Sequence, residues 1–241
     1  MSRAERALHH RTGLACEAAS DAGVPGRFRV WGQAGLRAVL ATDPALGFLS
    51  TVSGVTRETL PAVTGFVDAP GWDGVEPTVV VPAEFGERPM AGFARTGDRL
   101  LAVKRLEPRP AADAPPDAAD EDTFLRVLLA GFEAHGVLAA FLAAEHRLPV
   151  MRRFLVVERA GPIAAAGMTI HGDVAVLGAA STLRAHRGRG AQPRLLQRRL
   201  QVAAEAGCTL AVATAKPGSA SAANLGRAGF HLHRRSAWTK L

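Results

Sequence analysis

The sequence of 241 residues contains no tyrosine and only two cysteines, Cys16 and Cys208. Without tyrosine, no phenol can serve as an acid or a base, and two cysteines are too few for a disulfide framework. No apolar run approaches the roughly 20 residues of a membrane-spanning helix. The opening stretch, MSRAERALHHRTG, is polar and lacks the apolar core of a secretory signal. These absences predict a cytoplasmic protein with no membrane association.

What the chain does contain is enough apolar material for a core and an excess of positive charge. Hydrophobic residues make up 48% of the sequence and charged residues 21%, which excludes disorder by composition. The net charge is +7 and the isoelectric point about 10.8. This balance suits an anionic partner, such as a nucleic acid, an acidic membrane or a phosphorylated small molecule.

A proline-rich and acidic segment divides the chain. Residues 107–122 read EPRPAADAPPDAADED and hold four prolines and six acids, with no large apolar side chain. This composition is typical of a stiff linker or an exposed loop. The sequence therefore predicts one domain over 1–106, a linker over 107–122 and a second domain over 123–241.

The second domain begins with a helical pattern and continues with extended ones. Residues 123–148 have helical spacing, broken at Gly136. Three extended stretches follow at about 154–158, 162–171 and 173–182, separated by Ala-Gly-Pro and His-Gly-Asp turns.

Another helix is predicted over 191–206 by an apolar stripe. Proline is tolerated in a first helical turn, so Pro193 places the start of this helix at 190–192. On the same helix, Arg194, Arg198 and Arg199 are interpreted as an exposed face. The remaining predicted elements are a buried strand over 209–215, a short helix capped by Ser219 and ended before Gly229, and one or two strands over 231–240.

The loop LRAHRGRGAQPRLL, residues 183–196, places two glycines among basic side chains immediately before this helix. A helix N-terminus exposes unpaired N–H groups and a partial positive charge, and glycines allow the backbone to approach an anion closely. Arg187 and Arg189 add charge there. A strand, such a loop and a helix in sequence predict a phosphate-binding site.

The segment Arg187-Gly188-Arg189-Gly190-Ala191 resembles the R-x-x-G-x-G/A loop of the GCN5-related N-acetyltransferases, the GNAT superfamily. The order strand, loop, helix, strand, then Asn224 and Arg-Ala-Gly-Phe at 227–230 resembles the same family, and the resemblance covers about 123–241. One departure is Gln192 at the last motif position, where the family prefers glycine or alanine. The resemblance implies an α/β fold with α+β layers, a mixed central sheet flanked by helices. The cofactor-binding residues it implies are Ser181, Thr182, Leu183, Arg187, Gly188, Arg189, Gly190, Ala191, Gln192 and Asn224.

The activity that the resemblance implies is transfer of an acetyl or other acyl group from coenzyme A (CoA). Acetyl-CoA would lie between two splayed parallel strands, and an acceptor amine of a small molecule or a protein would attack its thioester directly. Many family members protonate the departing thiolate with a tyrosine, which this chain lacks; a thiolate with a pKa of about 8.5 can leave without one. The catalytic residues stay unassigned, and the candidates for a base are Glu145, His146, Glu158 and His171.

The first half of the chain contains short segments that are similar in sequence to segments of the second half. Ser50-Thr51 is similar to Ser181-Thr182, and TVVVPA at 78–83 to AVATAKPG at 211–218; Ala91-Gly92-Phe93 is similar to Ala228-Gly229-Phe230. The first half has VSGVTRE in place of the Arg-Gly loop. We therefore predict two tandem copies of one fold, with 1–106 a degenerate copy that binds no phosphate.

Other interpretations stay open. A non-catalytic acyl-CoA-binding module is the alternative to an enzyme, and nucleic-acid binding is a weak third possibility supported only by charge. His231 and His233 alternate on a predicted strand without a third ligand at a metal-binding spacing, so no metal is predicted.

Overall fold

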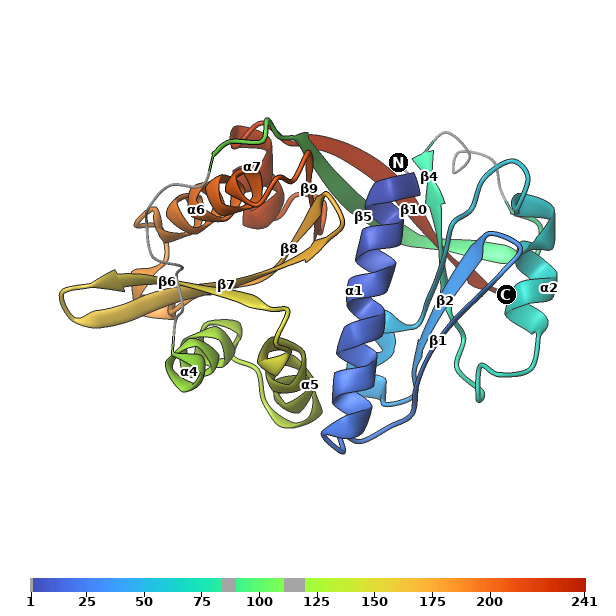
Figure 1. Cartoon of the computed structure of the whole chain (residues 1–241). Coiled ribbons are helices and arrows are strands. Elements are labelled where there is room, and N and C mark those ends of the chain that lie inside the picture. Colours follow the sequence, from blue (N-terminus) through green and yellow to red (C-terminus); the bar gives the residue numbers. More distant parts are fainter. Residues whose placement is uncertain (1, 84–89, 111–119) are drawn as a thin grey trace.

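The described part of the chain forms one mixed sheet of ten strands with helices on both faces (Figure 1). The computed structural model describes residues 2–83, 90–110 and 120–241. The helices are α1 (Ser2–Asp21), α2 (Val63–Asp68), α4 (Glu121–Phe132), α5 (Gly136–Arg147), α6 (Ala191–Glu205) and α7 (Ala220–Arg227). The strands are β1 (Phe28–Gln33), β2 (Leu36–Ala41), β3 (Thr51–Ser53), β4 (Thr78–Pro82), β5 (Phe93–Arg105), β6 (Arg152–Glu158), β7 (Gly161–His171), β8 (Val174–Thr182), β9 (Leu210–Ala215) and β10 (His231–Lys240).

The order of strands is the same on both sides of the sheet centre. The antiparallel pair β10–β5 lies in the middle, followed outward by β4-β3-β2-β1 on one side and β9-β8-β7-β6 on the other. The pairs β3–β4 and β8–β9 are parallel. A mixed central sheet flanked by helices confirms the predicted fold class.

The two halves of the chain exchange their last strands. β5 comes from the first half but pairs with β9, and β10 comes from the second half but pairs with β4. Both halves therefore contribute to one continuous sheet, so neither has a complete sheet of its own.

The pairing registers of the two parallel strand pairs show that one of the predicted similarities between the halves joins segments at different positions in the fold. The parallel pairing of β3 with β4 begins at Thr51 and Thr78, and that of β8 with β9 begins at Val174 and Leu210. Thr51 thus occupies the position of Val174, whereas Thr182 lies at the far end of β8. The similarity of Ser50-Thr51 to Ser181-Thr182 does not reflect equivalent positions.

Helix α4 begins earlier than the sequence predicted. Asp120 caps it by accepting a hydrogen bond from the backbone N–H of Thr123 at 2.9 Å, and Glu121 and Asp122 lie in its first turn. Acids are favourable there because they face the positive end of the helix dipole. Assigning residues 121 and 122 to the linker was therefore wrong; its residues 111–119 lie outside the described residues.

Most other predicted elements of the second half are confirmed within two residues. Helix α6 begins at Ala191 with Pro193 in its first turn, and the Ser219 hydroxyl accepts a hydrogen bond from the backbone N–H of Ala222 at 3.1 Å to cap α7. Residues 231–240 form the single strand β10. These elements depend on local capping and proline geometry, which is why the sequence alone predicts them.

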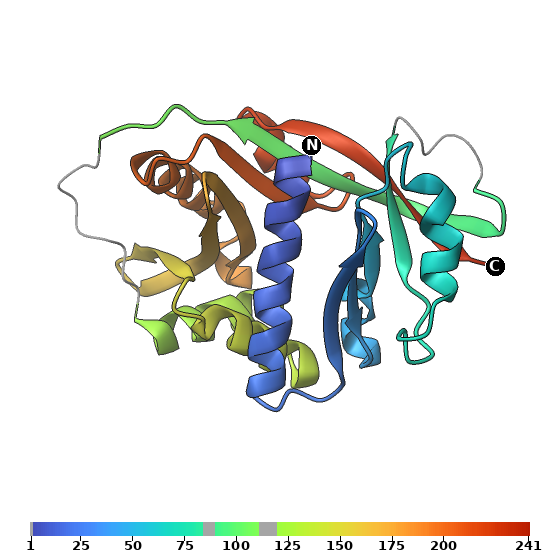
Figure 2. The same ribbon diagram turned by 45° about the vertical axis from the view of Figure 1, so that its right-hand side comes forward.

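The helices of the second half cover opposite faces of the sheet. Figures 1 and 2 show α6 and α7 on one face and α4 and α5 on the other. Successive residues of β7 alternate between the two cores: Ala164 packs in the cluster of Leu195 from α6, and Ala165 in that of Phe124 from α4. Each fully buried side chain of the size of Leu195 contributes about 1.5–3 kcal/mol.

Helix α4 lies directly on the end of β8. A Cβ atom added to Gly131 would lie 2.5 Å from the Ser181 hydroxyl oxygen, so only glycine allows this approach. The same hydroxyl donates a hydrogen bond to the Leu128 carbonyl at 2.9 Å. The C-terminus of α4 is thereby held beside the loop that follows β8.

Helix α1 lies between the two halves in both ribbon views (Figures 1 and 2). Its Glu5 carboxylate is 3.4 Å from the Arg37 guanidinium of β2 and 3.8 Å from that of Arg235 in β10. Six residues later on the same helix, Arg11 pairs with Glu145 of α5 at 2.8 Å. The helix therefore links the two halves through buried ion pairs of opposite polarity.

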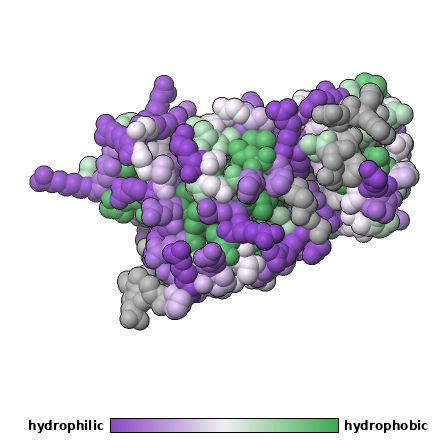
Figure 3. Space-filling view, turned by 90° about the horizontal axis from the view of Figure 1, so that it is seen from above, coloured by the Kyte–Doolittle hydropathy of each residue, from purple (hydrophilic) through white to green (hydrophobic). Residues whose placement is uncertain are grey.

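Hydrophilic residues cover much of the face seen from above, and hydrophobic surface shows chiefly toward the middle (Figure 3). Across the described ranges, no helix combines the length and apolar character needed to cross a membrane.

Candidate functional site

Strands β8 and β9 diverge after a short parallel pairing. They are paired from Val174 and Leu210 to Val176 and Val212, and β9 then continues along β5. The end of β8 therefore turns one backbone edge toward a wedge-shaped opening in the sheet. A backbone edge of this kind can accept an extended polar ligand.

A cavity of about 670 Å³ lies over this opening. It is bounded by the C-terminus of α4, the end of β8, the N-terminus of α6 and helix α7. Its volume lies in the usual range for small-molecule sites. Eight of the ten predicted cofactor-binding residues line it: Ser181, Thr182, Arg187, Gly188, Gly190, Ala191, Gln192 and Asn224.

Two predicted residues, Leu183 and Arg189, do not belong to the cavity lining. The backbone N–H of Leu183 donates to the Ile163 carbonyl at 2.9 Å, so it faces β7. Arg189 lies between the two lining glycines, and its side chain is exposed.

The glycines of the loop have a left-handed backbone conformation that is suited to an anion site. Gly188 and Gly190 both have φ of 78°, the left-handed region that side chains with a Cβ avoid. Gly190 is the N-cap of α6, and no side chain of the described residues caps this helix. The first N–H groups of α6 therefore keep their hydrogen-bonding capacity at the cavity wall.

The guanidinium of Arg187 anchors the loop. It donates to the Gly131 carbonyl of α4 at 2.9 Å and to the Thr182 carbonyl at 3.3 Å, and Glu133 lies 3.5 Å away. Its charge remains near the cavity, but these hydrogen bonds hold the loop to α4 and β8. Only the tertiary contact with α4 reveals this role.

Gln192 folds back onto the strand edge. Its side-chain amide donates to the Ser181 carbonyl and to the Thr182 hydroxyl, both at 2.9 Å. Gln192, the residue that departs from the family motif, is thus hydrogen-bonded to the Ser181 carbonyl on the edge of β8 that faces the cavity.

We expect Gln192→Ala to strengthen acetyl-CoA binding about two- to tenfold, because each such hydrogen bond contributes about 0.5–1.5 kcal/mol and must break before a ligand pairs there. The backbone N–H of residue 192 is unchanged by the substitution. Titration calorimetry measures the effect, with Gln197→Ala on the exposed face of α6 as the matched control. Weaker binding by Gln192→Ala than by the control would contradict this account.

Arg199 is buried, contrary to its interpretation as part of an exposed face. It is 4% exposed and lines the cavity. Its spacing of four residues from both Leu195 and Ala203 places it on the buried stripe of α6, a signal that was present in the sequence. Arg194 is exposed as predicted, and Arg198 is partly buried.

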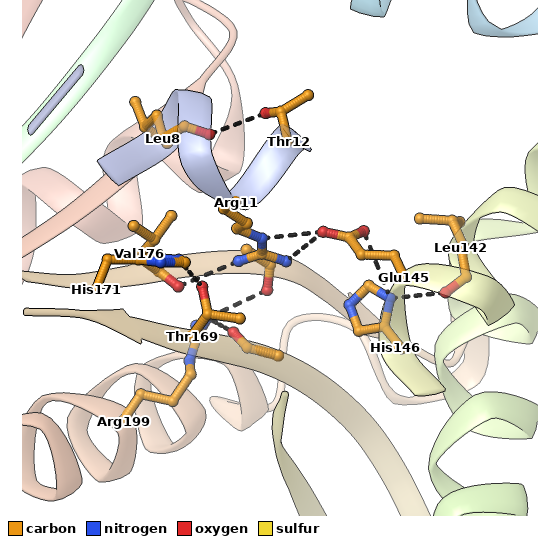
Figure 4. A network of polar contacts seen from close by, with 12 residues as sticks. Leu8, Arg11, Thr12, Leu142, Glu145, His146, Thr169, His171, Val176 and Arg199 are labelled. Carbon is orange, nitrogen blue, oxygen red and sulfur yellow. Dashed lines mark hydrogen bonds and ion pairs between the residues drawn. The ribbon is translucent and has the colours of Figure 1, made fainter. Parts of the chain in front are cut away.

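A polar network lies on the other side of β7 and β8 (Figure 4). Arg11 of α1 donates from two nitrogens to one Glu145 carboxylate oxygen, at 2.9 and 2.8 Å, and from a third to the Val176 carbonyl at 3.1 Å. Burial alone would raise the pKa of Glu145, but the Arg11 guanidinium holds it below its ordinary value. Glu145 is therefore ionised and paired.

None of the four candidates for a base lines the cavity. Glu145 is tied to Arg11, and burial lowers the pKa of His146, whose Nδ1 lies 2.8 Å from the Leu142 carbonyl. Burial, followed by the neighbouring His10, lowers the pKa of His171 to about 4. Glu158 lies 3.7 Å from His186. The geometry thus assigns the role of base to none of them.

Within the described residues, no group of three or more His, Cys, Asp or Glu side chains could hold a metal ion. Cys208 is fully buried in the core beneath α6.

No protein-family model matches the sequence, and no curated protein does. Solved structures do match. A GCN5-related N-acetyltransferase from Kribbella flavida has a TM-score of 0.62 at 17% identity, over 94% of this chain and 95% of that one. Another from Sphaerobacter thermophilus has a TM-score of 0.59 at 16% identity, over 85% and 80%. A GNAT-family acetyltransferase from Colwellia psychrerythraea has a TM-score of 0.57 at 14% identity, over 90% and 85%.

These similarities extend over most of the chain, including both halves, and they concern the fold. The protein has the fold of the GCN5-related N-acetyltransferases, as the Arg-Gly loop indicated.

Proposed function

We propose that this protein is a cytoplasmic acyltransferase that binds acetyl-CoA or another acyl-CoA in the cavity and transfers the acyl group to an amine. The observation that carries the proposal is the cavity that joins the open edge of β8 to the uncapped N-terminus of α6. The pyrophosphate would accept hydrogen bonds from the N–H groups of 188–192. The pantetheine arm would lie along residues 180–183.

The chemistry of the proposal is direct attack of the amine on the thioester carbonyl. The N–C bond forms, the C–S bond breaks, and the CoA thiolate leaves while the ammonium proton passes to solvent. Because none of the four candidate bases lines the cavity, the protein's contribution would be positioning and stabilisation of the oxyanion. The acceptor is proposed only as an amine of a small molecule or a protein.

We also propose that the two halves are copies of one unit. The matching strand order on each side of β10–β5 and the two equivalent parallel pairs support this. In the first half, the connection from β3 to β4 contains the six-residue α2 in place of the fifteen-residue α6. Phe66 of α2 packs there in a cluster with Trp31 and Trp72, whose ring centroids are 4.6 Å apart. Such an apolar cluster is unsuited to phosphate.

A non-catalytic acyl-CoA-binding module is the second candidate. It is favoured by the absence of tyrosine and by the contact of Gln192 with the β8 edge. Calorimetry with acetyl-CoA, followed by free-thiol detection over a panel of amines, distinguishes the two. We expect binding and amine-dependent thiol release; binding without release would favour the module, and no binding of any acyl-CoA would contradict both.

A further inference from the structure

We propose that the acyl-CoA taken by this cavity carries an acyl chain that ends in a carboxylate, and that the guanidinium of Arg199 recognises this carboxylate. The inference rests on the proposed function and names the substrate class for the same site. The class comprises the CoA monothioesters of short dicarboxylic acids.

Arg199 is a buried cation without a counter-ion in the described chain. Its guanidinium donates to three neutral carbonyls, those of Leu195 at 3.2 Å, Gly167 at 3.3 Å and Gly178 at 3.5 Å. No ion pair joins it to a carboxylate of the described residues, and the only charged side chain that shifts its pKa is Arg11. Burial, and then Arg11, lower its pKa to about 9, so the side chain still carries its charge at neutral pH. A buried charge that lacks an opposite charge is costly, and an anion that enters beside it offsets that cost.

The position of Arg199 matches the place expected for the acyl group. It lies eight residues after Ala191, about 12 Å along α6 from the N-terminus that would hold the pyrophosphate. Its contact with Gly178 lies four residues before Thr182 on β8, beyond the segment proposed for the pantetheine arm. The cavity thus has a phosphate-binding feature at one end and a buried guanidinium toward the other.

The neighbouring charges leave Arg199 uncompensated. In Figure 4, Arg199 approaches β7 and β8 from α6, and Arg11 approaches from α1 on the opposite side. The charge of Arg11 is matched by Glu145, and burial lowers the pKa of His146, which favours its neutral form. One positive charge remains. A carboxylate would be attracted to it, whereas a methyl group at the same place would leave it unpaired.

The transfer itself needs no additional reactant. The amine nitrogen bonds to the thioester carbon, the thiolate leaves, and the distal carboxylate is unchanged. The product is an amide that carries a negative charge where the amine was positive.

The test compares acyl-CoA esters with the same number of acyl carbons by titration calorimetry. We expect malonyl-CoA to bind at least about tenfold more tightly than propionyl-CoA, or succinyl-CoA than butyryl-CoA, as a single charge-assisted pair warrants. Arg199→Met should abolish this preference and Arg199→Lys should keep part of it. Free CoA should bind all three proteins alike, because it has no acyl chain.

Arg194→Met, on the exposed face of the same helix, is the matched control and should leave the preference unchanged. Thermal unfolding of each variant shows whether it is folded. If Arg199→Met does not fold, the inference is tested by comparing the ester preference of the wild type with that of Arg199→Lys. Three results would overturn the inference. The first is equal affinity of the wild type for charged and neutral esters, and the second is a preference for charged esters that persists in a folded Arg199→Met variant. The third is a preference that is as large in Arg199→Lys as in the wild type. Failure to bind even free CoA would instead overturn the proposed function.

Discussion

Replacement of Gly190 by aspartate is expected to weaken acetyl-CoA binding by at least about a hundredfold. Gly190 lines the cavity at the N-cap of α6, and a Cβ atom added to it would have no described atom within 4 Å, so a new side chain would extend into open space at the site. The carboxylate would repel the pyrophosphate and compete for the helix N–H groups. Titration calorimetry measures the loss.

The control is Gly207→Asp. Gly207 follows α6 at its other end, has φ of 79° and likewise has no described atom within 4 Å of an added Cβ. Both substitutions thus carry the same charge and a similar backbone strain of about 1–2 kcal/mol. If the two variants bind acetyl-CoA with equal affinity, the loop is not the phosphate site.

Replacement of Glu145 by alanine is expected to lower the free energy of unfolding by about 3–5 kcal/mol, the usual cost of removing one member of a buried ion pair. Both side chains are nearly inaccessible, at 9% for Arg11 and 11% for Glu145. Without the carboxylate, the Arg11 guanidinium would keep the Val176 carbonyl as its partner and lose its counter-ion. Denaturant titration measures the change.

The pair also contributes to the pH dependence of stability. The folded-state pKa of Glu145 is below its ordinary value, because the charge and hydrogen bonds of Arg11 outweigh the effect of burial. The contribution of Glu145 to the free energy of unfolding is therefore complete above its unfolded-state pKa of about 4.3. This contribution is lost as the pH falls through the folded-state pKa of Glu145.

Glu121→Ala provides the comparison. Its carboxylate lies 3.3 Å from Arg147 and from Arg153 but is more than a third exposed, so its removal should cost less than about 1 kcal/mol. The double variant Arg11→Met, Glu145→Leu should recover much of the stability that Glu145→Ala loses, because no unpaired charge is left. If Glu145→Ala and Glu121→Ala lower the free energy of unfolding equally, burial of the Arg11–Glu145 pair does not increase its contribution to stability.

Several parts of the site were predictable because they depend on neighbours in sequence. Pro193 placed the start of α6, and the glycines at 188 and 190 indicated a loop with left-handed backbone. The extended stretches at 162–171 and 173–182, separated by a His-Gly-Asp turn, predicted β7 and β8. Capping, proline geometry and side-chain periodicity act within a few residues, so a single sequence contains them.

Other features required contacts between distant segments. Arg187 donates to Gly131, 56 residues away, and Arg11 reaches Glu145 across 134 residues. Neither pairing leaves a periodic signal in the sequence. The burial of Arg199 was visible in its spacing, but the lack of a counter-ion among the described residues was not, because that depends on every segment that packs around it.

The sequence by itself determined the order of elements in the second half, the glycine loop before α6 and the likeness to the GNAT fold, since each rests on local conformational preference or on a contiguous motif. Only the tertiary structure decided that β5 and β10 change places in the sheet, that Gln192 covers the edge of β8, and that the Arg199 guanidinium lies in the cavity wall with no carboxylate of the described chain beside it. Strand exchange and charge balance are set by long-range packing, where several pairings satisfy the same hydrophobic pattern and the whole chain selects one.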